Sequence, residues 1–311
     1  MCYEQLMKNK LSSFILILIT SSIAFSMDIL TMGSGHYMSV ESHLTQDNKP
    51  VFILLPGLYR ALDMRDEFIQ KAKKQKLNFV SIHTSLHPDS IKEIPSDESP
   101  YFLSHKVTAK DLANEVEAVI AYYKIANPII VSLSYSSVIS TELAQTGKYP
   151  LIIETAPMIR SDESNPSGGQ LTEFWKNYLS LIPAFGSFWR DTYLNQIYTA
   201  YWKQELGNII FKYPEFKTPE QQSLLVKSFT ALSVIADGFD YSTQEFTEGV
   251  KRIYILGKDE DSHRFELQQQ AIEKYQKQTG HDKNVILLSA GHIVPSDAPE
   301  AYVNTLKKLI K

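Results

Sequence analysis

The stretch Ile129-Ile130-Val131-Ser132-Leu133-Ser134-Tyr135-Ser136-Ser137 has the pattern of a buried strand that runs into a tight turn. The apolar start predicts the strand, and the register places Ser134 at the tip of the turn, where a helix opens. A strained turn of this kind requires small residues two positions to either side, and serine is the next-smallest choice after glycine and alanine. Ser132 and Ser136 meet that requirement. Ser134 is therefore a candidate nucleophile, and the alternative is a serine that caps a helix.

A second segment, Ser289-Ala290-Gly291-His292-Ile293-Val294-Pro295, places a histidine just beyond another apolar run, 285–288. The carboxyl ends of parallel strands meet at one edge of a sheet, so such a histidine can reach other strand ends. His292 is therefore the candidate general base. His83 also ends a predicted strand and is the rival base. The alternative for His292 is an ordinary histidine in a surface loop.

Backbone N–H groups near the candidate serine are predicted to face the same edge. The segment Leu54-Leu55-Pro56-Gly57-Leu58-Tyr59 ends a buried strand in a glycine turn. The turn after Ser134 leaves the N–H of Tyr135 near the nucleophile, and N–H groups at a helix start favour negative charge. The N–H groups of Leu58 and Tyr135 are therefore the candidate oxyanion hole. The alternative is a plain turn that terminates a strand.

An acid that could orient the histidine is expected in the loop 257–261, directly after a predicted strand. A carboxylate there would hold the imidazole in the correct tautomer and stabilise its protonated form. Three acids follow one another, and the preferred order is Asp261, then Asp259, with Glu260 possible. Glu154 and Asp162, which follow an earlier strand, are outside candidates. An acidic loop can also be merely solvated.

Apolar runs alternate with helical patterns, which predicts an α/β fold with a mostly parallel sheet and helices on both faces. Strands are expected at 51–55, 77–83, 128–133, 151–154, 252–256 and 284–288, and helices at 107–125, 135–145, 265–277 and 299–310. Thr108 and Asp111 fit a capping box for the first of these helices. Residues 157–248 lack a strand pattern and carry all three tryptophans. This predicts a helical insert over the strand ends, with a core of 27–156 and 249–311.

Residues 1–26 have the pattern of a secretory signal peptide. Two lysines precede the apolar run 11–25, and small residues at Ala24 and Ser26 predict cleavage after Ser26. The run is shorter than the roughly 20 residues of a spanning helix, so cleavage is preferred to an uncleaved anchor. The sequence thus predicts a periplasmic or secreted protein, inferred to be bacterial, with no stable membrane anchor after cleavage.

Composition excludes several classes of function. The formal net charge of −4 and the absence of a basic stripe give no support for a nucleic-acid partner. Cys2 is the only cysteine and lies in the predicted signal peptide, so disulfides, a cysteine nucleophile and thiolate metal sites are excluded from the mature chain. The segment Met32-Gly33-Ser34-Gly35-His36 neither follows a predicted strand nor opens a predicted helix, so it is weak evidence for phosphate binding. No cofactor and no metal are expected.

Taken together, these segments resemble the α/β-hydrolase superfamily. The matching segments are Leu55-Pro56-Gly57, Ser132-Leu133-Ser134-Tyr135-Ser136, the loop from Gly257 to Asp261, and Gly291-His292-Ile293-Val294-Pro295. Their chain order of serine, acid and histidine is that of the superfamily. Serine stands in place of both glycines of the superfamily's serine turn, and the acid loop is about one residue out of the usual register.

The resemblance implies an α/β-hydrolase fold with a helical cap and a serine hydrolase that acts by acyl transfer without a cofactor. Ser134, His292 and an acid of the loop, Asp261 first, would form its triad. The aromatic insert favours a small substrate with an apolar portion, an ester first and an amide or peptide bond second. The rival interpretation is a catalytically inactive binding protein on the same fold. A third is a membrane-tethered enzyme or adaptor that keeps 11–25 as an anchor.

Overall fold

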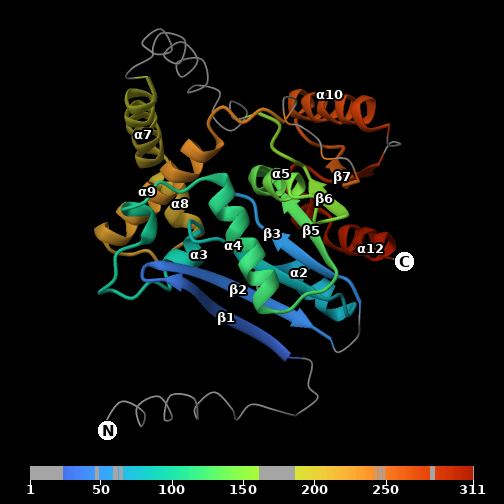
Figure 1. Ribbon diagram of the computed structural model, residues 1–311, viewed down its shortest axis with the longest axis horizontal. Coiled ribbons are helices and arrows are strands. Elements are labelled where there is room, and N and C mark those ends of the chain that lie inside the picture. Colours follow the sequence, from blue (N-terminus) through green and yellow to red (C-terminus); the bar gives the residue numbers. More distant parts are fainter. Residues whose placement is uncertain are drawn as a thin grey trace.

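The structure is a computed structural model that describes residues 24–45, 49–58, 62, 66–160, 186–241, 244, 247, 249–280 and 284–310. Strands of these residues form one sheet in the order β1-β2-β4-β3-β5-β6-β7-β8 (Figure 1). The strands are β1 (Ala24–Gly33), β2 (His36–Leu44), β3 (Val51–Leu55), β4 (Phe79–His83), β5 (Pro128–Leu133), β6 (Leu151–Thr155), β7 (Lys251–Gly257) and β8 (Val285–Leu288). β2 runs antiparallel to β1 and β4, and every other neighbouring pair is parallel.

Helices cover both faces of this sheet (Figure 1). They are α2 (Glu67–Lys74), α3 (Pro88–Ile91), α4 (Ala109–Tyr122), α5 (Ser137–Gln145), α7 (Gly186–Gln204), α8 (Leu206–Lys212), α9 (Pro219–Ala236), α10 (Ser262–Thr279), α11 (Val294–Asp297) and α12 (Pro299–Leu309), with 3₁₀ turns η2 (Tyr101–Leu103) and η3 (Ser134–Ser136). α4, α5 and α10 pack on one face, and α2, α11 and α12 on the other. Neighbouring residues such as Ile53 and Leu54 enter opposite cores, so the central strands are buried on both faces.

The predicted α/β architecture with a mostly parallel sheet is confirmed. β5 spans the predicted 128–133, and the strand that leads to the candidate histidine ends at 288 as expected. α4 begins at the predicted capping box, in which the Asp111 N–H donates to the Thr108 hydroxyl at 3.2 Å. Long apolar runs and helix caps are local signals, which is why these elements could be recognised without the tertiary structure.

The sequence analysis missed β1 and β2, which form a hairpin at one edge of the sheet. Polar residues interrupt β2, among them Ser39, Glu41 and Ser42, although their side chains are buried. The strand therefore shows neither a continuous apolar run nor a clear alternation of apolar and polar residues. The segment Met32 to His36 spans the end of β1, the hairpin turn and the start of β2, which the sequence analysis did not predict; as expected, it does not open a helix.

Among the described residues, the helices α7, α8 and α9 lie between β6 and β7 in sequence, within the predicted insert 157–248. They lie together at one end of the molecule (Figure 1). Trp202 of α7 donates its Nε1–H to Ser233 of α9 at 2.9 Å, and its ring centroid lies 5.0 Å from that of Phe229. These aromatic residues therefore pack the helices against one another. Residues 161–185 lie outside the described residues.

Most of the predicted signal peptide, residues 1–23, also lies outside the described part of the chain. Residues 24–26 open β1, where they pair with 42–44 of β2. Cleavage after Ser26 would leave β1 with residues 27–33, and this cleavage stays a prediction. Across the residues that the structure describes, no helix is long and apolar enough to cross a membrane.

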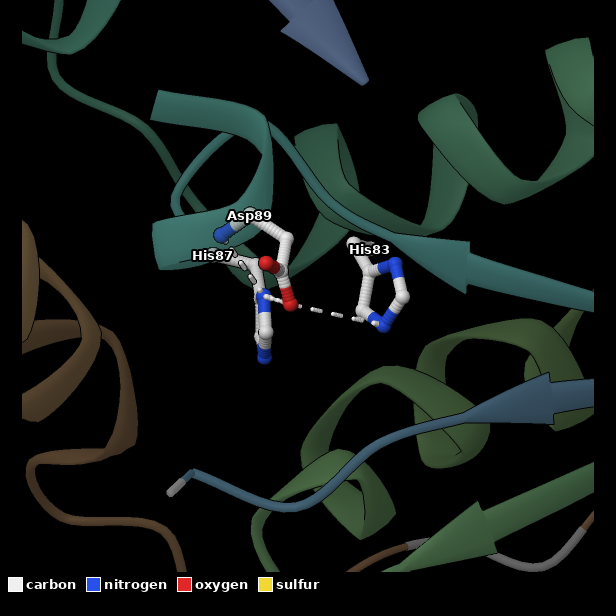
Figure 2. A group of neighbouring side chains, drawn as sticks. All are labelled: His83, His87 and Asp89. Carbon is white, nitrogen blue, oxygen red and sulfur yellow. Dashed lines mark hydrogen bonds and ion pairs between the residues drawn. The ribbon is translucent and has the colours of Figure 1, made fainter. Parts of the chain in front are cut away.

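β4 ends at His83, and a short turn leads from it into α3. The Nδ1 of His87 accepts a hydrogen bond from the Asp89 N–H at 3.2 Å and so caps the start of this helix. Figure 2 shows that the side chains of His83, His87 and Asp89 meet at the turn. No helix was predicted here, because four residues are too few to show a helical period.

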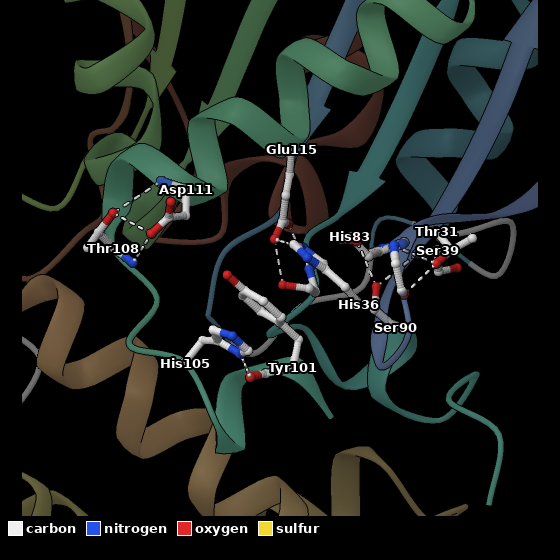
Figure 3. Close-up of polar contacts among 12 residues, drawn as sticks. Thr31, His36, Ser39, His83, Ser90, Tyr101, His105, Thr108, Asp111 and Glu115 are labelled. Carbon is white, nitrogen blue, oxygen red and sulfur yellow. Dashed lines mark hydrogen bonds and ion pairs between the residues drawn. The ribbon is translucent and has the colours of Figure 1, made fainter. Parts of the chain in front are cut away.

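Glu115 of α4 is buried and joins the hairpin to the turn after β4 (Figure 3). The Nε2 of His36, at the start of β2, lies 2.7 Å from Glu115 Oε1. The N–H and hydroxyl of Ser85 donate to the same carboxylate at 2.9 and 2.5 Å. Tyr101 stacks on His36 with ring centroids 4.5 Å apart. These contacts fix the turn after β4 at the carboxyl edge of the parallel strands.

Candidate active site

Ser134 lies at the tip of the turn between β5 and α5. Its φ of 52° is in the left-handed region, which costs a residue with a side chain on the order of 1–3 kcal/mol. The surrounding structure holds this conformation. The Ser134 carbonyl accepts a hydrogen bond from the Met158 N–H at 3.1 Å, and Ser132 and Ser136 are buried on either side. Such a turn presents the serine hydroxyl above the end of the sheet.

His292 meets Ser134, although the two residues lie 158 positions apart in the chain. The loop between β8 and α11 carries His292, and its Nε2 lies 2.8 Å from Ser134 Oγ. β6 and β7 separate the two parent strands, so the common direction of all four brings both side chains to one edge. This geometry suits transfer of the hydroxyl proton to the imidazole. His83, the rival base, instead faces Asp89, with 4.0 Å between Nε2 and Oδ2.

The carboxylate at His292 belongs to Glu260 and not to Asp261, which the sequence analysis placed first. Glu260 Oε1 lies 2.6 Å from His292 Nδ1, and the Glu260 side chain is 1% exposed. Asp261 instead caps α10, where its Oδ1 accepts from the N–H groups of His263 and Arg264 at 3.1 and 3.2 Å. An aspartate directly before a helical segment is an N-cap signature. That signal was present in the sequence and argues against Asp261, but it leaves both Asp259 and Glu260 as candidates.

The other acidic candidates have different surroundings. Asp259 is exposed, and its backbone N–H donates to the Ala290 carbonyl at 2.9 Å. Glu154 is buried in β6, where its Oε1 lies 3.3 Å from the Nη1 of Arg252. This ion pair satisfies the buried carboxylate within the core, away from the loops that carry the histidine. Asp162 lies outside the described residues.

Backbone hydrogen bonds join the loop after β7 to the loop after β8. The Lys258 N–H donates to the Leu288 carbonyl at 2.9 Å, and the Asp259 bond to Ala290 follows it. Gly257 lies where the two loops touch, because a Cβ added there would be 2.1 Å from the Gly291 carbonyl oxygen. The absence of a side chain at Gly257 is therefore what allows the acid and the histidine loops to approach.

Gly257→Ala is expected to lower about 100-fold any ester turnover that this site catalyses, because a displacement of roughly 1 Å in a catalytic group has an effect of this size. The added methyl group would push the backbone at Gly291, and His292 with it, away from the serine. Measurement of kcat/KM on a p-nitrophenyl ester tests this. Gly207→Ala in α8, where an added Cβ meets nothing within 4 Å, is the matched control and should keep full activity. Activity of Gly257→Ala within twofold of the wild type would contradict the argument.

The loop after β3 lies directly against the serine. A Cβ added to Gly57 would be 3.6 Å from Ser134 Cβ, which places the backbone at Gly57 and Leu58 beside the candidate nucleophile. Tyr135 follows Ser134 and lies in the first turn of η3, whose first N–H groups have no partner within the helix. The predicted donors Leu58 and Tyr135 thus belong to two segments that flank one hydroxyl, as an oxyanion hole requires.

The Ser136 hydroxyl joins these two segments, since it donates a hydrogen bond to the buried Pro56 carbonyl. A glycine could not make this bond, and the sequence analysis considered only the small size of the serine.

Ser136→Ala is expected to lower the free energy of unfolding by about 1–3 kcal/mol, because the carbonyl would lose its partner in the interior. Urea unfolding measures this. In Ser132→Ala, the control, the change should be smaller, because the buried Ser132 hydroxyl has no partner among the described residues. Equal losses in the two variants would contradict the assignment.

A small cavity of about 20 Å³ lies between the loop after β3 and α9. Its walls are mainly apolar and include Leu58, Tyr135 and Leu232, with His87 at the end of the turn after β4. The Tyr135 hydroxyl donates to the Leu232 carbonyl at 3.0 Å, so α9 is held directly over the residue that follows the serine. Burial raises the pKa of the Tyr135 phenol, which keeps it protonated and able to donate.

No protein-family model matches the chain, and no curated protein is similar to it in sequence. Solved structures are nevertheless similar in fold. An α/β-hydrolase enzyme from a Medee basin deep-sea metagenome library has a TM-score of 0.57 at 14% identity, covering 90% of this chain and 96% of the other. The thioesterase domain from the curacin biosynthetic pathway has a TM-score of 0.55 at 14% identity, covering 91% and 99%. For the enol-lactonase from Burkholderia xenovorans, the TM-score is 0.54 at 15% identity, and the coverage is 88% and 96%.

The chain therefore has the α/β-hydrolase fold, and the resemblance drawn from its sequence is confirmed at the level of the fold. The serine, the histidine and the glutamate lie at the ends of parallel strands, at the edge where such folds place their sites. A fold of this kind hosts many reactions, so the reaction of this chain must be argued from the geometry of its own residues.

Proposed function

We propose that this protein is a serine hydrolase that cleaves an ester bond by acyl transfer. The proposal rests on two consecutive contacts that link three side chains. It runs from Ser134 Oγ to His292 Nε2 at 2.8 Å, and from His292 Nδ1 to Glu260 Oε1 at 2.6 Å. A nucleophile, a base within hydrogen-bond reach and a third group that orients the base are the three parts of such a triad. The similar solved structures include hydrolases, which supports this class of reaction.

In the first half of the proposed reaction, Ser134 Oγ attacks the ester carbonyl carbon while His292 Nε2 accepts the hydroxyl proton. The Glu260 carboxylate accepts the hydrogen bond from His292 Nδ1–H, which fixes the tautomer and stabilises the imidazolium. The N–H groups of Leu58 and Tyr135 would stabilise the oxyanion, each by about 2.7–4 kcal/mol. His292 then donates its proton to the leaving alcohol oxygen as the C–O bond breaks, and the acyl group remains on Ser134.

In the second half, a water molecule attacks the acyl carbon and gives its proton to His292. The bond between the acyl carbon and Ser134 Oγ breaks, and the imidazolium returns the proton to that oxygen. The carboxylic acid product leaves and the serine is regenerated. Neither half requires a cofactor, since His292 accepts and returns one proton in each half, the first from Ser134 to the leaving alcohol and the second from water to Ser134.

The inserted helices support an ester with an apolar portion as the substrate. We infer that α7, α8 and α9 form a cap, because α9 covers Tyr135 and contributes Leu232 to the apolar cavity beside the serine. Apolar walls with a few polar groups are typical of sites for small molecules. An amide or peptide bond is the second candidate, since the same acyl-transfer chemistry cleaves it.

The rival interpretation, a catalytically inactive binding protein, depended on serine in place of both glycines of the turn. Both serines are buried in the structure, and Ser134 has the positive φ that the turn needs. The Ser136 hydroxyl even holds the neighbouring loop. The substitution therefore leaves the serine geometry intact, which favours the enzyme.

Covalent labelling tests the proposed function. Purified folded protein should react with a fluorophosphonate probe at one site per chain, and peptide mapping should locate the adduct on Ser134. The same protein should hydrolyse p-nitrophenyl esters with an initial burst if deacylation is the slower half. Folded protein that neither takes up the probe nor turns over any ester of a graded acyl series would overturn the proposal.

A further inference from the structure

Three side chains that the proposed reaction does not use are buried together at the turn between β4 and α3. His83 ends the strand, His87 precedes the helix, and Asp89 lies in its first turn (Figure 2). Their exposed fractions are 1%, 5% and 2%. Two imidazoles and a carboxylate are costly to bury unless a partner compensates them, so the group requires a physical explanation.

The distances within this group exceed those of direct hydrogen bonds. Asp89 Oδ2 lies 3.6 Å from His87 Nδ1 and 4.0 Å from His83 Nε2. One ligand atom from each residue can be chosen so that all three lie within 4.8 Å of one another. Two atoms that each bind a common ion at about 2.1 Å are roughly 3.4 Å apart in a tetrahedral site. The three side chains therefore surround a point that a single ion can reach after small inward shifts.

One oxygen of the Asp89 carboxylate is buried between the two imidazoles. Asp89 Oδ1 pairs with Lys92 Nζ at 2.6 Å, whereas the buried Asp89 Oδ2 has no hydrogen-bond partner among the described residues. His87 Nδ1 accepts the Asp89 N–H at 3.2 Å, and because this nitrogen has one lone pair, it would bind an ion in place of that hydrogen bond.

We propose that His83, His87 and Asp89 bind a divalent transition-metal ion of the zinc type. Two imidazole nitrogens and one carboxylate oxygen are a ligand set that zinc prefers, and three protein ligands leave a fourth position for water. His87 also lines the cavity beside Leu58, so the ion lies in the wall of that cavity.

The bound ion ties the end of β4 to the start of α3. This turn is already held from two sides, because the Ser90 hydroxyl donates to the His83 carbonyl at 2.7 Å and Ser228 of α9 donates to the Leu86 carbonyl. An ion that binds only the folded chain adds stability by mass action. The site therefore stabilises the segment on which α9 rests, and it takes no part in the acyl transfer.

Titration of the full chain with zinc chloride, after dialysis against a chelator, tests the proposal by calorimetry and thermal unfolding. The wild type should bind one zinc per chain and unfold at a higher temperature when zinc is present. His83→Gln and Asp89→Asn should each weaken zinc binding by about 100-fold or more, since each removes a ligand. His43→Gln, which removes an equally buried imidazole outside the group, should bind zinc as the wild type does. Ser134→Ala should also keep zinc binding, which separates this site from the proposed function.

A second measurement covers the case in which the ligand variants do not fold. Cobalt chloride added to the wild type should give the visible absorption bands of a four-coordinate nitrogen and oxygen site, and one equivalent of zinc should abolish them. Wild-type protein with no stoichiometric zinc binding would overturn the proposal. So would zinc binding that His83→Gln and Asp89→Asn leave unchanged, or cobalt bands typical only of a hydrated ion.

Discussion

Under the proposed function, Ser134→Ala is expected to lower the turnover of p-nitrophenyl esters by at least about 10³-fold, because a triad acts as a unit and this variant removes the proposed nucleophile. Fluorophosphonate labelling of this variant should disappear. The fold should persist, since alanine is no larger than serine and the φ of 52° at this position disfavours both residues alike. Steady-state kinetics, labelling and circular dichroism on the same preparation measure the three expectations.

Ser104→Ala is the control for this variant, because Ser104 is an exposed serine whose hydroxyl donates to the Tyr101 carbonyl at 3.2 Å and lies 2.9 Å from His105 Nδ1. It should retain wild-type activity and labelling. Undiminished labelling of Ser134→Ala would show that another residue is the nucleophile. Loss of activity together with loss of structure would require Ser134→Gly, in which the positive φ costs nothing, before the role of the hydroxyl could be decided.

Glu260→Gln is expected to lower kcat on the order of 10³-fold, while Asp261→Asn leaves it near the wild-type value. The amide keeps the shape of the glutamate but removes the charge that stabilises the His292 imidazolium. Asparagine caps a helix about as well as aspartate, so Asp261→Asn preserves the start of α10. The comparison separates the acid that reaches the histidine from the acid next to it in sequence.

Stability measurements on two further variants of this loop sharpen this test. Asp261→Ala should lower the free energy of unfolding by about 1 kcal/mol, the usual effect of losing an N-cap, with little change in kcat. Asp259→Asn should be neutral in both measurements, because this side chain is exposed. A large loss of kcat in Asp261→Asn, with Glu260→Gln unaffected, would return Asp261 to the role that the sequence analysis first gave it.

The fold could be predicted where its signals are local. The strand that leads to Ser134 is a continuous apolar run, and the box of Thr108 and Asp111 marks the start of α4 within a few residues. The hairpin of β1 and β2 could not be predicted in the same way, because buried polar residues interrupt the apolar pattern of β2 and the strand also bonds to a segment distant in the chain. Ser39, for example, donates its backbone N–H to the Ser90 hydroxyl at 2.8 Å, and no residue pattern within β2 predicts this contact.

The sequence by itself determined the serine turn, the histidine loop and the order of the strands that carry them. Each depends on short-range steric limits and on apolar runs, and both of these can be recognised from residues that follow one another in the chain. Only the tertiary structure decided between the neighbouring acids and placed His83 beside His87 and Asp89. The Glu260 side chain faces His292 because backbone hydrogen bonds cross from the loop after β7 to Leu288 and Ala290. Such bonds join segments that are remote in the chain, and their register depends on how the whole sheet packs.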